Sequence, residues 1–401
     1  MKSVRDIRSY LQISKGEVGM TNLLEVVVTA RPSWARVKNL VLEYAKLNSP
    51  DSVRICLIGP SVSERYGDLR EQIPDGIEVK AFPSLGESDS LESVALNCLA
   101  GATALARHWG SSRPDCVLVI ADRTETLGVA STAALMQIPL IHLQGGEVSG
   151  SIDDKIRDTN SKLADLHLTT NEYTTARLVS MGEKMENIFP IGCPSIDLVK
   201  ESLLTKIEDL TKLEVRGVGS NIDLAKPFGI LMFHPDTLNE EENLVIIRAL
   251  IEMVKLSTIN WVWFWPNPDH GTHIISKEIR KAREHQLLEN VKFVINLPPE
   301  IFLHLAVNSR VLVGNSSFGI REASFIGLPV INIGKRQNGR QKSSNVSDFP
   351  NFVSVGELRS YVEAFESKLI RFPSATLYGD GNAGITGAKI ISEWIPGSKV
   401  R

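Results

Sequence analysis

The sequence has little that would indicate disulfide bonds, membrane insertion or a polyanionic partner. Its 401 residues include only four cysteines, and these form no C-x-x-C pair, so neither a disulfide framework nor a zinc site is expected. No apolar run reaches the roughly 20 residues of a membrane span. With 44 basic and 47 acidic residues, the chain has no basic excess for nucleic acid or anionic lipid. We therefore expect a cytoplasmic protein with no nucleic-acid or membrane partner.

The N-terminal stretch MKSVRDIRSYLQISKGEVG lacks the features of a secretory signal. Charges interrupt its apolar residues every few positions, whereas a signal peptide has a continuous apolar core. We interpret residues 1–21 as an extension ahead of the first strand. The length of 401 residues exceeds that of one ordinary domain, so the prediction is two domains.

Short apolar runs alternate with helix-like stretches along most of the chain. LLEVVV, VRICLIG, CVLVIAD and PLIHLQ are followed by loops or by apolar residues at helical spacing, which is typical of βαβ units in a parallel sheet. A charged stretch near residue 200 interrupts this pattern, and it restarts with FGILMF, WVWFW, RVLVGN and PVINIG. We predict an α/β protein with two Rossmann-like domains, 22–200 and 201–375, facing across a cleft. A final helix within 376–401 is expected to cross back to the first domain.

Polar and ionisable residues gather where the predicted strands of the first domain end. Carboxyl ends of parallel strands meet at one edge of a sheet, so these side chains should share the cleft. Each group taken alone is equally explained as a helix cap or a surface ion pair. Several carboxylates in one cleft can have pKa values driven apart, which suits one as an acid and another as a base. The residues are Arg31, Asp122, Arg123, Glu125, Gln144, Glu147, Asp153 and Asp154.

The second domain carries the motif VGNSSFGIREASFIGLP at 313–329. A strand ends at Gly314, and Ser316 and Ser317 begin a helix whose N–H groups and hydroxyls can bind a phosphate. Glu322 is placed to accept hydrogen bonds from ribose hydroxyls. The alternative is a plain serine-capped helix. The motif lacks the spacing of NAD sites and of the P-loop, so neither cofactor is predicted.

Two further strand ends and a basic loop add polar groups to the second domain. His234 follows the strand ending LMF, and Asn267 and Asp269 follow WVWFW. The loop GKRQNGRQK contains Arg336 and Arg340 and is either a solvated loop or an anion-binding flap. No histidine has metal-ligand spacing to a second ligand, so no metal is predicted.

Several long motifs, in this order, resemble the hydrolysing UDP-N-acetylglucosamine 2-epimerases: ADRTETLGVASTAALMQIPLIHLQGGEVSGSIDDKIRDTNSKLADLHLTTNEYTTARLVSMGE, GCPSID and GNSSFGIREASFIGLPVINIGKRQNGR. The resemblance spans residues 22–395. It implies a GT-B-like fold, an active site between the domains, and a homodimer or homotetramer. It also implies loss of UDP across C1–C2 and addition of water with inversion at C2, which gives N-acetylmannosamine for sialic acid synthesis.

The resemblance leaves other functions open. Some relatives act on a UDP-2,4-diacetamido-6-deoxy sugar in the legionaminic acid pathway. A GT-B-like glycosyltransferase would need an acceptor and would leave C2 unaltered. A non-catalytic binder of sugar nucleotides would bind UDP without releasing it from a sugar.

Roles for individual residues also follow from the resemblance. Asp122 matches the family's catalytic aspartate, and Asp153 matches the acidic residue after the G-G-E-V-S-G motif. Arg31 and Arg157 match arginines near the diphosphate. The nucleotide-side matches are His234 near UDP, Ser316 and Ser317 at the diphosphate, Glu322 at the ribose, and Arg336.

The chain departs from the family pattern beside these matches. Ile120 and Ala121 replace a histidine and a glycine, Asp158 replaces a histidine, and Gln144 stands where many members carry a catalytic glutamate. An amide cannot shuttle a proton as a carboxylate can. Either the sugar differs and needs an amide contact, or the chemistry is impaired, or another carboxylate takes the role, with Glu125, Glu147 and Asp158 as candidates.

The loop that begins at Gln144 carries a hypothesis of its own. We expect Gly145 and Gly146 to let the backbone pass close to the sugar, while Asp153 and Arg157 reach into the cleft. Gln144 would then contact the substrate rather than move its proton.

Overall fold

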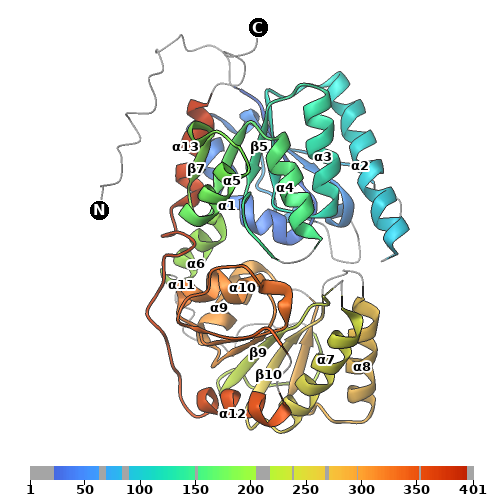
Figure 1. Ribbon diagram of the computed structural model, residues 1–401, viewed down its shortest axis with the longest axis vertical. Coiled ribbons are helices and arrows are strands. Elements are labelled where there is room, and N and C mark those ends of the chain that lie inside the picture. Colours follow the sequence, from blue (N-terminus) through green and yellow to red (C-terminus); the bar gives the residue numbers. More distant parts are fainter. Residues whose placement is uncertain are drawn as a thin grey trace.

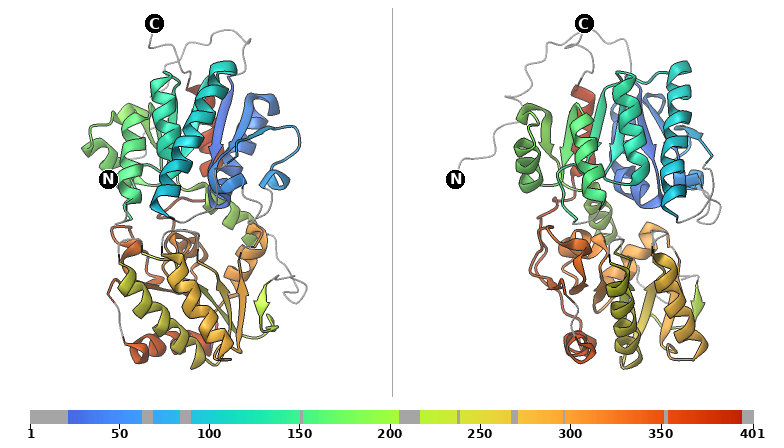
Figure 2. Two further views of the ribbon diagram at one scale, coloured as in Figure 1. Left: turned by 90° about the vertical axis from the view of Figure 1, so that its right-hand side faces the viewer. Right: turned by 45° about the vertical axis from the view of Figure 1, so that its right-hand side comes forward.

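The computed structural model describes residues 22–62, 69–83, 90–149, 152–204, 217–236, 239–266, 271–295, 297–351 and 354–394. Two helix-flanked sheets lie one above the other along the long axis of the molecule (Figures 1 and 2). The predicted α/β fold with two Rossmann-like domains is confirmed. No helix within the described ranges combines the length and apolarity needed to cross a membrane.

The first sheet is parallel throughout, in the order β3-β2-β1-β4-β5-β6-β7. Its strands are β1 (Leu24–Val28), β2 (Val53–Leu57), β3 (Glu78–Ala81), β4 (Cys116–Ile120), β5 (Leu140–Leu143), β6 (Leu166–Thr169) and β7 (Ile188–Pro190). The strand order reverses between β1 and β4, and ligands of such sheets bind at the carboxyl ends beside this reversal.

Helices cover both faces of the first sheet, so its central strands β1, β4 and β5 are fully buried. The helices are α1 (Arg31–Leu47), α2 (Leu91–Ser111), α3 (Thr124–Leu135), α4 (Asp153–Leu163) and α5 (Glu172–Ser180). On one face Trp34 and Leu40 of α1 enter the core. On the other, Trp109 of α2 packs with Val129 of α3.

The second sheet has the order β14-β13-β12-β9-β10-β11-β8, and only β8 is antiparallel to its neighbour. Its strands are β8 (Val218–Gly219), β9 (Phe228–Met232), β10 (Asn260–Phe264), β11 (Val291–Val294), β12 (Leu312–Gly314), β13 (Val330–Ile333) and β14 (Val346–Phe349). Its helices are α7 (Glu240–Lys255), α8 (Thr272–Glu284), α9 (Pro299–Asn308), α10 (Ser317–Ile320), α11 (Glu322–Ile326) and α12 (Val355–Glu366). From β9 to β14 it repeats the order of the first sheet, and its reversal lies between β9 and β12.

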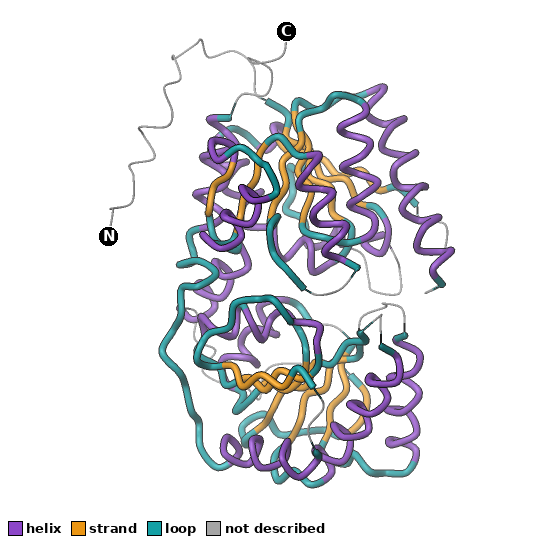
Figure 3. Tube along the Cα trace, in the orientation of Figure 1, coloured by secondary structure: helices purple, strands orange, loops and turns teal. Residues whose placement is uncertain are grey.

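Two helices tie the domains together. Residue 200, the expected boundary, falls inside α6 (Pro194–Leu204), whose Leu198 and Val199 pack in the core of the second domain. After α12, a long loop runs back along one side of the molecule (Figure 3). It leads to α13 (Ala383–Glu393), which packs against α1 in the first domain. The returning chain crosses the loop after β7 so closely that a Cβ on Gly379 would lie 3.0 Å from the Cα of Gly192.

Candidate active site

Arg157 lies at the centre of the predicted residues of the first domain. This α4 arginine is 1% exposed. Its guanidinium pairs with Asp122, just after β4, and with Asp154 in the first turn of α4, and it donates to the carbonyl of Glu147 at 2.7 Å. Burial, followed by the charge of Arg340, lowers the pKa of Arg157 well below its ordinary value. An added anion would favour the charged form of this arginine.

Glu147 of the first domain forms ion pairs with two arginines of the second. Its buried carboxylate lies 3.4 Å from Arg321 Nη1 and 3.0 Å from Arg340 Nη2. Burial opposes its ionisation, but Arg321, Arg340 and Arg36 together lower the pKa of Glu147 below its ordinary value. A carboxylate held ionised by two arginines is poorly suited to move protons near neutral pH, so its geometry is that of a link between domains.

Gln144 is buried at the end of β5 in a left-handed backbone conformation, with φ of 68°. Its Nε2 donates to Cys193 Sγ at 2.9 Å, whereas its buried Oε1 has no hydrogen-bond partner among the described residues. Ala121, at the end of neighbouring β4, also has a positive φ of 57°. Such backbones are strained for residues other than glycine and are concentrated at functional sites. The positive φ also explains why glycine is favoured at position 121.

Packing within the protein explains why the two residues after Gln144 are glycines. A Cβ on Gly145 would lie 2.8 Å from Ser161 Oγ, and one on Gly146 would lie 2.3 Å from the carbonyl oxygen of Thr174. The close packing of this loop on α4 and α5 therefore accounts for both glycines without a ligand.

The other acidic residues of this edge have different surroundings. Asp158 forms a bidentate pair with Arg177 of α5, at 2.6 and 2.7 Å. Glu125 is buried in the first turn of α3, 3.3 Å from Nε of half-buried Arg123. Asp153 is half-buried in the first turn of α4. All three candidate replacements for the missing glutamate, Glu125, Glu147 and Asp158, are thus paired with arginines.

Ser316 and Ser317 lie at the start of α10, where β12 ends. Ser316 Oγ accepts a 3.4 Å hydrogen bond from the N–H of Phe318, and Ser317 Oγ accepts from Arg321 at 3.1 Å. Arg36 of α1 also donates to Ser317 Oγ at 3.5 Å, across the two domains. The serine motif is therefore surrounded by guanidinium groups, an arrangement suited to a phosphate.

Asn315 holds His234 beside this motif. The Asn315 side chain accepts from the N–H of His234 and donates to its carbonyl, both at 2.8 Å, so the ends of β9 and β12 are joined. Glu322 begins α11 and has a buried Oε2 with no hydrogen-bond partner among the described residues. That oxygen is available to a hydroxyl of a ligand.

Arg31 and Arg336 are both half-buried, at the first turn of α1 and after β13 respectively. Asn267 and Asp269 lie outside the described residues.

Comparison with known proteins identifies the family. A family model described as UDP-N-acetylglucosamine 2-epimerase matches residues 46–392. The chain belongs to this family. It is 33% identical over 332 residues to a UDP-N,N'-diacetylbacillosamine 2-epimerase (hydrolyzing) of Legionella pneumophila, covering 82% of this chain and 84% of the relative. It is 31% identical over 325 residues to a UDP-N-acetylglucosamine 2-epimerase of Neisseria meningitidis, covering 80% and 81%.

Solved structures of the family share the fold. The UDP-N-acetylglucosamine 2-epimerase of Methanocaldococcus jannaschii, solved with UDP-GlcNAc and UDP, superposes with a TM-score of 0.72 at 15% identity, covering 92% of this chain and 99% of that one. This likeness concerns the arrangement of the two domains.

Sequence reasoning missed two arginines of this family member. Arg321 is 1% exposed and joins Glu147 to Ser317, and Arg36 reaches Ser317 from α1. Burial, together with the charge of Arg321, lowers the pKa of Arg36 to about 10. For Arg321 the available signal was the charged pair Arg321 and Glu322 inside the otherwise uncharged run SFGIREASFIG, because a charge in a buried segment requires a partner.

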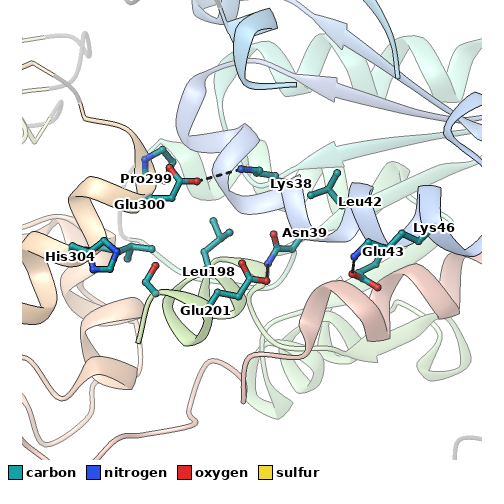
Figure 4. A pocket seen from close by; sticks show the side chains of 12 residues that line it. Lys38, Asn39, Leu42, Glu43, Lys46, Leu198, Glu201, Pro299, Glu300 and His304 are labelled. Atoms are coloured by element: carbon teal, nitrogen blue, oxygen red, sulfur yellow. Dashed lines mark hydrogen bonds and ion pairs between the residues drawn. The ribbon is translucent and has the colours of Figure 1, made fainter. Parts of the chain in front are cut away.

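A pocket of about 320 Å³ lies away from the strand ends, between α1, α6 and α9 (Figure 4). Lys38 of the first domain reaches Glu300 of the second across it, at 3.4 Å, and Asn39 donates to Glu201. None of the predicted site residues lines this pocket.

A group of potential metal ligands also lies elsewhere. The ligand atoms of Glu25, Cys56 and His108 lie within 4.8 Å of one another, a proximity that sequence spacing did not indicate. Glu25 is already paired with Arg54 and hydrogen-bonded by Trp109. The group is therefore explained as a buried ion pair beneath α2.

Proposed function

We propose that this protein is a hydrolysing 2-epimerase that converts UDP-N-acetylglucosamine and water to N-acetylmannosamine and UDP, for nonulosonic acid synthesis. The observation that carries the proposal is the meeting of two sets of groups from the two sheets. Asp122 and Arg157 stand at the strand ends of the first and Ser317 at those of the second, and Arg36 of α1 reaches Ser317 from the first domain. Family membership supports the reaction type.

The second domain is proposed to hold UDP. The serine hydroxyls, the α10 N–H groups and the neighbouring guanidinium groups would bind the diphosphate. Glu322 Oε2, which accepts no hydrogen bond from the described residues and lies 3.9 Å from Arg321 Nε, would accept from a ribose hydroxyl. Arg31, His234 and Arg336 would complete the contacts to the nucleotide.

The first domain is proposed to carry out the proton transfers. A base removes the proton from C2 while the C1–O bond to UDP breaks, which gives a 2-acetamidoglucal. Water then adds its hydroxyl to C1, and C2 receives a proton on the opposite face. Asp122 and Asp153 are the proposed acid and base, and Arg157 orients Asp122. Gln144 Oε1, which has no hydrogen-bond partner in the described part of the chain, would contact the sugar.

A second substrate is favoured by the relative of 33% identity, which is named for UDP-N,N'-diacetylbacillosamine. In that case the amide of Gln144 would contact a sugar with a second acetamido group, and the reaction at C1 and C2 would be the same.

Proton NMR in deuterated water separates these functions. The purified protein is given UDP-N-acetylglucosamine or UDP-N,N'-diacetylbacillosamine, and UDP release and the C2 proton of the product are followed together. Free N-acetylmannosamine with deuterium at C2 is the expected result. Turnover of UDP-N,N'-diacetylbacillosamine alone would show that this sugar nucleotide, and not UDP-N-acetylglucosamine, is the substrate. UDP binding without turnover of either sugar would contradict the proposed activity.

A further inference from the structure

The thiol of Cys193 is buried in the loop between β7 and α6 and contacts the end of β5. Its Sγ accepts a hydrogen bond from Gln144 Nε2 at 2.9 Å and lies 2.9 Å from Ser195 Oγ. Burial raises the pKa of Cys193, so the sulfur stays protonated at neutral pH. The S–H group can then donate to Ser195 while the sulfur accepts from Gln144.

The surrounding chain holds Cys193 in one place. Its N–H donates to the carbonyl of Tyr378 at 2.7 Å, where the chain that returns to α13 crosses this loop. Its side chain belongs to a buried cluster with Ile196 of α6 and Ile320 of α10. Residues of both domains and of the returning chain therefore pack around the thiol. A side chain locked by packing in this way is suited to orient another one.

The amide of Gln144 needs such an orienting contact, because its two ends have opposite hydrogen-bonding properties. Nε2 donates and Oε1 accepts, and half a turn of the amide would exchange them. The bond from Nε2 to Cys193 leaves Oε1, which is buried and receives no hydrogen bond from any described residue. A buried acceptor without a donor costs free energy that a bound donor recovers. Gln144 thus offers an acceptor to a ligand.

The position of Gln144 places this acceptor beside the proposed chemistry. Gln144 directly follows β5, which pairs with β4, and Asp122 lies just after β4. Both candidate sugars carry hydrogen-bond donors in their hydroxyl and acetamido groups. A site built to accept from such a donor discriminates strongly against a ligand that lacks it.

We propose that Cys193 is a positioning residue that fixes the amide of Gln144, so that Oε1 accepts a hydrogen bond from a hydroxyl or amide N–H of the sugar. The inference rests on the proposed function, which brings the sugar to this edge of the first sheet. Cys193 does not touch the reacting atoms and acts through Gln144. Its loss should therefore weaken recognition of the sugar and leave recognition of UDP unchanged.

The first test replaces Cys193 by alanine in the full chain. kcat/KM for the sugar nucleotide that the wild type turns over should fall roughly 3- to 10-fold, the scale of one neutral hydrogen bond. The inhibition constant of UDP should stay unchanged, because UDP lacks the hexose. Cys193→Ser, whose hydroxyl also accepts, should lose less. Cys116→Ala, which removes another buried thiol at the start of β4, is the matched control and should keep the wild-type kcat/KM.

A double-mutant cycle tests whether Cys193 acts through Gln144. Gln144→Met removes both polar ends of the amide, so adding Cys193→Ala to it should cause no further loss of kcat/KM. Gln144→Glu keeps an oxygen acceptor and should retain more kcat/KM than Gln144→Met. Circular dichroism checks that every variant is folded.

Three results would overturn the proposal: full kcat/KM in folded Cys193→Ala, an equal loss of UDP affinity, or additive losses in the double variant. Failure of the proposed function is a separate result, in which the wild type binds UDP but turns over neither sugar nucleotide. The Kd of each sugar nucleotide relative to that of UDP, measured by calorimetry on the same variants, then tests the role of Cys193.

Discussion

Asp153 is a half-buried carboxylate in the first turn of α4, beside the buried Arg157. Replacing Asp153 by Asn removes the group that we assign to proton transfer and keeps its shape. We expect kcat to fall by a factor of about 10²–10⁴, while the Kd for UDP stays unchanged. Glu172→Gln, in the exposed first turn of α5, is the control and should retain wild-type kcat. Full turnover by the Asp153→Asn enzyme would show that a different group carries out the proton transfer.

Arg36 gives a prediction for nucleotide binding. Its guanidinium lies 3.5 Å from Ser317 Oγ, where the diphosphate is proposed to bind. A charge-assisted hydrogen bond contributes about 1.5–3 kcal/mol, so Arg36→Ala should weaken UDP binding by about 10-fold or more in calorimetry. Lys38→Ala lies on the same helix but lines the separate pocket with Glu300, and its UDP affinity should match the wild type.

Individual residues show where sequence reasoning succeeded and where it failed. Asp122 was expected at the sheet edge because it follows a strand, and the resemblance placed Arg157 near the diphosphate; the structure pairs the two side chains. The role of Glu147 could not be deduced, because Arg321 and Arg340 lie more than 170 residues later in the chain. Pairing over such a separation depends on how the domains meet, which local patterns do not encode.

At the scale of elements, the central strands were predictable, whereas the edge strands β3 and β8 were not. β4 and β9 are apolar runs because helices cover both of their faces. β3 at the sheet edge reads EVKA and is largely exposed, so it lacks the apolar pattern. The two-residue β8 is too short to give any period.

The junction of α6 and α13 gives a prediction on pH. Asp197 of α6 accepts hydrogen bonds from the N–H groups of Ala383 and Gly384, at 3.0 and 2.6 Å, at the start of α13. Burial outweighs these donors and raises the pKa of Asp197 to about 6. The folded state therefore binds a proton more tightly than the unfolded state, and this group's contribution to stability is lost as pH rises from about 4 to about 6.

Asp197→Asn should remove that dependence. Denaturant unfolding of wild type and variant at several pH values gives the difference in their free energies of unfolding. The difference should shift in favour of the variant between pH 4 and 6 and stay constant above pH 7. A difference that is constant from pH 4 to 8 would show that Asp197 has an ordinary pKa.

At the scale of the whole molecule, Glu147 joins the two domains through Arg321 and Arg340. Glu147→Gln would leave these buried arginines without their carboxylate, and breaking a buried pair costs about 3–5 kcal/mol. We expect a loss of that order in the free energy of unfolding at pH 7. Since the pKa of Glu147 is lowered, its stabilisation is present above pH 4.5 and is lost as pH falls below that value.

Measuring the free energy of unfolding at pH 7 and at pH 3 separates the loss of the Glu147 charge from a general destabilisation by the substitution. The difference in free energy of unfolding between wild type and Glu147→Gln should be smaller at pH 3, because Glu147 of the wild type is then protonated and uncharged. Glu300→Gln, whose exposed pair with Lys38 also joins the domains, should cost less than about 1 kcal/mol at both pH values.

The return of α13 to the first domain fixes the order in which this protein can be completed during synthesis. Ala388 and Ile391 belong to the core around α1, yet they are synthesised after the whole second domain. The second domain lies entirely within the intervening chain, so it can close while the first still exposes the α1 side of its sheet. A nascent chain stalled before Ala383 would therefore present that apolar surface to chaperones, although all seven strands of the first sheet had already been made.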